Sequence, residues 1–255
     1  MLAVLQSILL GLLTNIVWLP IGALLVALGY FIQVRLPRRK LWRLSKPSDL
    51  VVCAATSTVT DTGEYHRPAT GIGQVRALAV AVNSLSKAYS RQLDLDNILF
   101  SIEPLQERIE HDLLLLGGPK NNEATAHFLN AMKDVQPALQ FANPDRIVWR
   151  EKTNKGRWVN NGAVEFTAKV ARKQVVIDYG LIMRVQNPFT TTRDTSVILL
   201  SGGHTYGLVA AAKFFAENMK KMAKHVKQRN LVAVVSTHVI DGHPARIKLE
   251  KIYSW

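Results

Sequence analysis

Two glycine-rich turns have the composition of a ligand-binding loop. The stretch LLLLGGPKNN covers residues 113–122, and LLSGGHTYG covers residues 199–207. In each, an apolar run of strand length ends in Gly-Gly, and a helical pattern starts a few residues later. Glycine lets the backbone approach a ligand closely, and the N–H groups at a helix N-terminus attract anions. The turns predict a site for a phosphate-bearing ligand, although Gly-Gly also serves simply as a tight turn.

In the predicted site, backbone N–H groups hold the phosphate and Lys120 supplies positive charge. The amides of Asn121 and Asn122 and the hydroxyl of Thr205 reach the ribose or the base, and the ring of Tyr206 stacks on the base. Ligands of open α/β sheets bind at the carboxyl ends of strands, so we expect both turns to line one pocket. The residues assigned to it are Gly117, Gly118, Lys120, Asn121, Asn122, Gly202, Gly203, His204, Thr205 and Tyr206.

Two other segments are candidates for contacts with the same ligand. The long, hydroxyl-rich loop at 56–76 offers Thr56, Ser57, Arg67, Gly71, Gly73 and Arg76 for phosphate or ribose. Its Gly71-x-Gly73 is not a full dinucleotide fingerprint, because Arg76 occupies the place of the third glycine. In QNPF (186–189), Asn187 could present an amide to a base and Phe189 could stack on it. Asn-Pro also favours a purely structural turn.

The elements that would position these turns alternate between strand and helix. Apolar runs at 49–56, 97–104, 112–118, 175–185, 195–203 and 230–240 predict buried strands, and the alternating residues 245–255 predict an edge strand. Apolar stripes predict helices at 72–89, 123–132 and 207–227, the first with Val75, Leu78, Val82, Leu85 and Tyr89 inward. The fold class is α/β: a Rossmann-like, mainly parallel sheet over residues 49–255.

Residues 146–171 change the pattern and predict antiparallel strands. Turn sequences stand at 153–156 and at Asn160-Asn161-Gly162. We interpret this segment as a β-hairpin insertion in the Rossmann-like domain.

The N-terminus predicts an uncleaved transmembrane helix over residues 1–34. No charged residue occurs from Met1 to Val34, and Ile8 to Val34 could span about 30 Å of hydrocarbon as a helix. Pro20 allows a kink, or a span that starts nearer Ile16. A cleaved signal peptide would have its basic residues before the apolar run and small residues at its end. Here the basic residues follow the run, and its end is bulky.

The basic segment 35–48 sets the expected orientation. Six cations without an acid before Asp49 favour the cytoplasmic side and attract anionic lipid headgroups: Arg35, Arg38, Arg39, Lys40, Arg43 and Lys46. This juxtamembrane linker would place Trp42 at the membrane interface and residues 49–255 in the cytoplasm, with the protein in the cell inner membrane. Expected partners are the lipid bilayer, an anionic small molecule and a second copy through the membrane helix.

Charge and cysteine content agree with that placement. Without these six cations, 26 of the 32 basic residues remain against 19 acidic ones, an excess that suits an anionic ligand or mere solubility. The single cysteine, Cys53, lies in an apolar run and excludes an internal disulfide. We interpret it as a buried structural thiol.

The segment LLSGGHTYGLVAAAKF (199–214) resembles the Gly-Gly-x-x-x-Gly loop and helix of the SLOG and LOG superfamily of Rossmann-like nucleotide-binding domains. The resemblance covers about twenty residues. It implies a sensor of a nucleotide-derived ligand in a bacterial conflict system such as antiviral defence, or a phosphoribohydrolase. This chain has no clear match to the glutamate-bearing catalytic motif of the hydrolases.

The sequence contains few signals of metal binding, nucleotide hydrolysis or nucleophilic catalysis. The seven histidines form no i, i+4 metal pair, and there is no Walker A motif or nucleophile elbow. No metal, no certain cofactor and no specific nucleic-acid binding are expected. Three functions remain open: a membrane-anchored sensor or effector that binds a nucleotide-like signalling ligand, a membrane-tethered enzyme that hydrolyses or transfers such a nucleotide, and a protein-interaction scaffold.

Overall fold

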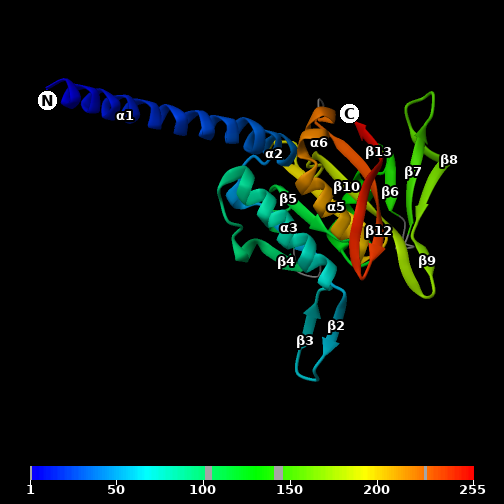
Figure 1. Ribbon diagram of the computed structural model, residues 1–255. Coiled ribbons are helices and arrows are strands. Elements are labelled where there is room, and N and C mark those ends of the chain that lie inside the picture. The colour runs from blue at the N-terminus through cyan, green and yellow to red at the C-terminus, as the bar shows by residue number, and fades with distance from the viewer. Residues whose placement is uncertain (1, 101–104, 141–145, 227–228) are drawn as a thin grey trace.

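The computed structural model describes residues 2–100, 105–140, 146–226 and 229–255. A long N-terminal helix projects from an α/β domain (Figure 1). It comprises α1 (Leu2–Tyr30), a π-helical stretch η1 (Phe31–Arg35) and α2 (Leu36–Trp42), and it continues through Pro20 without interruption. One candidate membrane span is found among the described residues, Trp18–Trp42, which is long and apolar enough to cross a bilayer. Exposed Trp18, Leu19 and Val26 on this helix favour an apolar environment.

The basic end of this helix packs on the domain, and Trp42 is buried there instead of lying at a membrane interface. Leu41 and Trp42 are fully buried. The indole N–H of Trp42 donates to Ser84 Oγ at 3.1 Å, and its ring meets Phe215 edge-to-face with centroids 5.2 Å apart. Helical periodicity explains the difference, because α2 continues α1 and turns these two apolar residues toward the core, while Lys40 stays exposed and Arg39 lies against Ala88.

The central sheet is mixed, with a parallel part and an antiparallel part. Its strand order is β13-β12-β10-β11-β5-β1-β4. Strands β11 (Ser196–Gly202), β5 (Leu113–Leu116), β1 (Val51–Ala54) and β4 (Ile98–Phe100) run parallel. Strands β10 (Gln174–Gln186), β12 (Leu231–Ile240) and β13 (His243–Ser254) extend the sheet in antiparallel fashion, and β9 (Lys169–Ala171) pairs with β10. The α/β class and the parallel centre are confirmed; residues 101–104 of the predicted strand 97–104 lie outside the described residues.

Both faces of the parallel strands are covered, which is why β1 and β5 are continuously apolar and wholly buried. On one face, Val52, Leu114 and Leu200 pack with α3 (Ile72–Tyr89) and α5 (Thr205–Glu217). On the other, Cys53, Leu115 and Leu199 pack with α4 (Glu123–Ala131) and with a three-stranded sheet. Cys53 is a buried free thiol, as expected.

Two helices differ from the prediction in detail. The buried side of α3 is its small-residue side, with Ala77, Ala81 and Leu85 inward, whereas Val75 is 49% exposed. The rest of the predicted stripe is largely confirmed, because Leu85 is buried and Leu78 and Tyr89 pack against the core. The alanines allow α3 to approach its neighbours closely. The helix predicted at 207–227 is broken at Asn218 into α5 and α6 (Met219–His225); residues 227–228 lie outside the described residues.

The three-stranded antiparallel sheet consists of β6 (Ala138–Gln140), β7 (Arg146–Lys152) and β8 (Trp158–Thr167). The turn at 153–156 forms as predicted, with Gly156 N–H donating to Thr153 O. The turn predicted at Asn160-Asn161-Gly162 is wrong, because these residues lie inside β8. Gly162 has φ +76° there, and the extra residues form a bulge in the pairing with β7.

The remaining elements are short. A hairpin of β2 (Thr58–Asp61) and β3 (His66–Ala69) extends from the domain (Figure 1). Within the described ranges, the single-turn 3₁₀ helices are η2 (Pro47–Asp49), η3 (Leu95–Asn97) and η4 (Gln106–Arg108).

Candidate ligand site at the carboxyl edge of the parallel strands

The two glycine turns line one cavity of about 300 Å³. They meet because β5 and β11 are adjacent and parallel, with Leu116 opposite Leu200, so both strands end at the same edge of the sheet. The N–H of Gly117 donates to Leu200 O at 2.9 Å and ties the first turn to the second strand. The shared pocket that the sequence predicts therefore exists as a cavity.

Ten of the predicted site residues line this cavity. They are Ser57, Gly71, Gly117, Gly118, Lys120, Asn121, Gly202, Gly203, His204 and Thr205. The loop at 56–76 contributes through Ser57 and Gly71, because the first turn of α3 opens on the cavity.

Four lining residues were not predicted: Gln74, Pro119, Gln140 and Leu208. Gln140 lies between the two turns. Its Nε2 donates to Gly202 O at 2.7 Å and its Oε1 accepts the hydroxyl of Ser201, while a Cβ on Gly118 would lie 3.0 Å from the same Oε1. It comes from β6, in a different sheet, and no local sequence signal identifies it. Gln74 and Leu208 could have been found as first-turn residues of helices that follow candidate loops.

Asn122 has a structural role instead of facing the ligand. It is buried and caps α4, with its Oδ1 accepting the N–H of Thr125 at 3.1 Å. Its Nδ2 donates to Cys53 O and to Leu116 O, at 3.1 and 3.0 Å. An asparagine that precedes a helix satisfies the unpaired N–H groups of its first turn, and this need prevails over exposure to the cavity.

Asn187 and Phe189 lie at the wrong end of the sheet for this site. Strand β10 is antiparallel to β11, so the residues that follow β10 emerge at the opposite edge. Asn187 donates from Nδ2 to Ile109 O and His111 O, at 2.8 and 2.9 Å, and its Oδ1 accepts the N–H of Phe189. The turn reading of Asn-Pro is thus the one that the structure supports.

The remaining predicted residues do not line the cavity. Thr56 contacts the edge of the cavity only through its backbone, because its N–H donates to Asn121 O at 2.9 Å. Arg67 is exposed on the β2–β3 hairpin, and Arg76 is on α3. Gly73 packs on Thr205, and Tyr206 lies in the first turn of α5 with its ring outside the cavity lining.

Folding alone explains two of the glycines. Gly117 has φ +103°, a conformation that other residues rarely adopt. A Cβ on Gly202 would lie 2.2 Å from the backbone nitrogen of Leu208, because α5 crosses the sheet at close range there. Glycine at these positions is therefore no evidence for a ligand, whereas the donors and positive charges around the cavity favour an anion.

Several backbone N–H groups at the cavity are already engaged. Gly203 donates to Tyr179 O at 2.9 Å, and His204 donates to the Asp178 carboxylate at 3.2 Å. The N–H groups of Gly118 and Thr205, by contrast, have no acceptor within the described part of the chain. These two donors come from the two turns, and Thr205 opens the positive end of the 13-residue helix α5.

Asp178 contacts the N-terminus of α5 on the side that faces the core. It is fully buried on β10 and accepts the N–H of Gly207 at 2.5 Å and of Tyr179 at 2.8 Å. Burial raises the pKa of this carboxyl, and the backbone donors and His204 only partly oppose that effect. Asp178 does not line the cavity. It caps α5 from the core side through the N–H groups of His204 and Gly207, and the N–H of Thr205 is left for another acceptor.

The chemistry available in the cavity is that of binding an anion. Lys120 and His204 supply basic side chains, Asn121, Gln74 and Ser57 supply neutral polar groups, and no carboxylate belongs to the lining that the structure describes. In the described ranges no group of three His, Cys, Asp or Glu residues could hold a metal ion. No family model matches the sequence, and a search of curated proteins finds no relative.

Proposed function

We propose that this protein is a membrane-anchored sensor whose α/β domain, Rossmann-like with 146–171 as its β insertion, binds a small nucleotide-like ligand through its phosphate. The observation that carries the proposal is the convergence of both glycine turns on one cavity. That cavity combines unengaged N–H donors, a lysine and several amides, and its described lining has no carboxylate.

The size of the cavity favours a mononucleotide. Small-molecule pockets have volumes of about 300–1,000 Å³, and this cavity of about 300 Å³ is at the lower limit. One phosphate on the N–H groups of Gly118 and Thr205 leaves room for a ribose beside Asn121 and Gln74. Leu208 offers an apolar contact for part of a base.

A sensing role, as opposed to storage or transport, is favoured by helix α3. Its N-terminal end contributes Gln74 to the cavity, and its C-terminal end holds the base of the membrane helix. There Arg39 Nε donates to Ala88 O at 2.9 Å, and Trp42 donates to Ser84. A rigid helix of 18 residues, about 27 Å long, thus joins the ligand cavity to the membrane anchor. A ligand that moves the start of α3 would move the anchor.

A thermal-shift screen of the purified full chain in detergent tests this proposal. Ligands would be mononucleotides, cyclic mononucleotides, cyclic dinucleotides, NAD derivatives and inorganic phosphate. We expect a mononucleotide to raise Tm most, since a ligand at 100 times its Kd stabilises by about 2.7 kcal/mol. No shift with any phosphate compound would refute the proposal in favour of a scaffold. Products after incubation with the nucleotides would establish the enzyme instead.

A further inference from the structure

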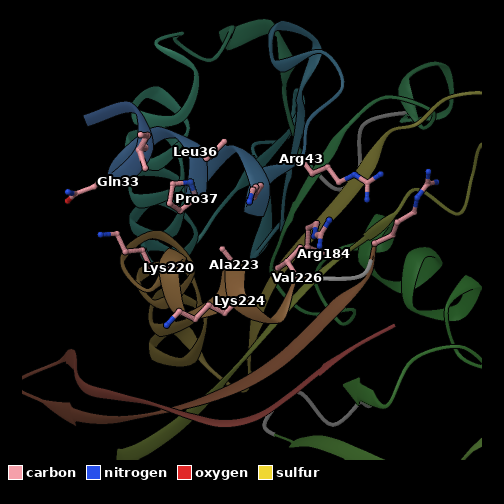
Figure 2. Close-up of a pocket in the computed structure, with 12 residues that line it drawn as sticks. Gln33, Leu36, Pro37, Arg43, Arg184, Lys220, Ala223, Lys224 and Val226 are labelled. Carbon is pink, nitrogen blue, oxygen red and sulfur yellow. The ribbon is translucent and has the colours of Figure 1, made fainter. Parts of the chain in front are cut away.

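A second cavity, of about 980 Å³, lies where the membrane helix meets the domain. It is bounded by η1 and α2, by α6, and by the end of β10 (Figure 2). Six cations line it: Lys40, Arg43, Arg184, Lys220, Lys224 and Arg229. They come from four separate parts of the sequence, so only the tertiary structure gathers them.

Little negative charge offsets this cluster. No carboxylate lines the cavity among the residues that the structure describes. Asp194, which is exposed at the rim, forms ion pairs with Arg43 at 3.4 Å and Arg229 at 3.7 Å. Lys40, Lys220 and Lys224 have no ion-pair partner in the described ranges. The cavity therefore retains a strong positive potential that an anion would relieve.

Arg184 adds a desolvated charge to the cavity. Its side chain is fully buried, and burial, together with the neighbouring charge of Arg43, lowers its pKa to about 10. The guanidinium thus remains protonated at neutral pH. A buried cation beside a second cation is stabilised by any anion that reaches it.

The cavity also has an apolar wall that continues the surface of the membrane helix. Ile32 and Leu36 line it and are 52% and 37% exposed, and Pro37, Ala223 and Val226 complete this wall. In Figure 2, Leu36 and Pro37 lie above Lys220, Lys224 and Ala223 of α6. A soluble phosphate would bind the cations and leave the apolar wall exposed to water. A molecule with a charged headgroup and hydrocarbon chains would contact the cations and also cover the apolar wall.

We propose that this cavity binds the phosphate headgroup of an anionic phospholipid, whose acyl chains extend along the membrane helix. The proposal rests on α1 being the membrane anchor. It is independent of the ligand at the glycine turns. The first charged residue, Arg35, follows the apolar helix directly, which places the cavity at the depth of lipid headgroups.

The test uses the full chain in a neutral detergent, with short-chain phosphatidylglycerol, short-chain phosphatidylcholine or glycerol phosphate added. The probe variant is Lys220→Gln with Lys224→Gln, both exposed on α6. The control is Lys155→Gln with Lys169→Gln, which removes the same charge from exposed sites in the turn after β7 and in β9. Binding is measured as the concentration dependence of Tm.

We expect phosphatidylglycerol alone to raise Tm in the wild type and in the control variant. The probe variant should bind it about tenfold to thirtyfold more weakly, since each surface cation contributes about 1 kcal/mol to anionic-lipid binding. Equal shifts with phosphatidylcholine, or with glycerol phosphate, would overturn the lipid headgroup assignment. Unchanged binding in the probe variant would overturn the cavity as the site. The nucleotide-induced shift should persist in the probe variant, so failure of either proposal is recognised separately.

Discussion

The backbone N–H of Gly207 donates to the carboxylate of Asp178 at 2.5 Å, so strand β10 caps helix α5 from within the core. This buried carboxylate accepts the N–H groups of His204 and Gly207, and Thr205 lies between them at the cavity. This contact fixes the height of α5 above the sheet and thereby the position of the second glycine turn.

Asp178 should make stability depend on pH in a defined direction. Because burial raises its pKa in the folded state, the folded protein holds this proton more tightly than the unfolded chain. Stability from this group is therefore fully present below its ordinary pKa of 3.8 and is lost as pH rises through the raised value. In thermal unfolding of the full chain, wild-type Tm should fall relative to that of Asp178→Asn as pH rises from about 4 to 7. A constant difference would contradict this.

Gly202→Ala should destabilise the protein by about 1–3 kcal/mol, the usual range for overpacking. The added methyl would lie 2.2 Å from the Leu208 nitrogen, and neither backbone can yield without moving α5 from the sheet. Gly29→Ala, with nothing within 4 Å of the added methyl, is the matched control and should leave Tm of the domain unchanged. Equal Tm for both variants would show that α5 adapts.

Trp42→Ala should cost about 3–5 kcal/mol of stability, as for truncation of a buried aromatic residue. It would remove the bond to Ser84 Oγ and the contact with Phe215. Trp158→Ala on the half-buried β8 is the control and should have a smaller effect in the same thermal unfolding assay. If Trp42 instead behaved as an interfacial residue, its replacement would alter membrane association and leave the Tm of the domain in detergent unchanged.

Lys120→Ala should weaken binding of the phosphate ligand by about 1–2 kcal/mol, the value of one charge-assisted hydrogen bond. Lys120 is exposed at the cavity, so its loss should leave stability without ligand unchanged. Lys155→Ala, in the exposed turn after β7, controls for the change in net charge. Calorimetric titration with a mononucleotide measures both. Equal affinity in the two variants would remove Lys120 from the site.

Membrane orientation is tested by cysteine labelling in intact cells. With the N-terminus outside, a membrane-impermeant reagent should modify Ser7→Cys and leave Ser254→Cys, near the end of β13, unmodified until the cells are opened. Cys53 is buried and gives little background. Labelling of Ser254→Cys from outside would reverse the predicted orientation.

The sequence by itself determined the elements whose signals are local. The uncharged run at residues 1–34, the continuously apolar β1 and β5, and the helix 72–89 follow from composition and periodicity. The meeting of the glycine turns also follows from sequence, since parallel strands end at a common edge. That inference failed for Asn187, because nothing in its neighbourhood shows that β10 runs antiparallel to β11.

Only the tertiary structure decided contacts between distant segments. Gln140 reaches the glycine turns from a separate sheet, and Asn122 turns inward to cap α4. Trp42 looks interfacial in the sequence, but it fills the space between α3 and α5. Arg184 is a single cation within an apolar strand, and only the fold places five further lysines and arginines, from residues 40–43 and 220–229, around the same cavity. Side-chain burial and charge clustering depend on which surfaces pack together in the fold. A single sequence indicates those surfaces only where a strong hydrophobic periodicity marks them.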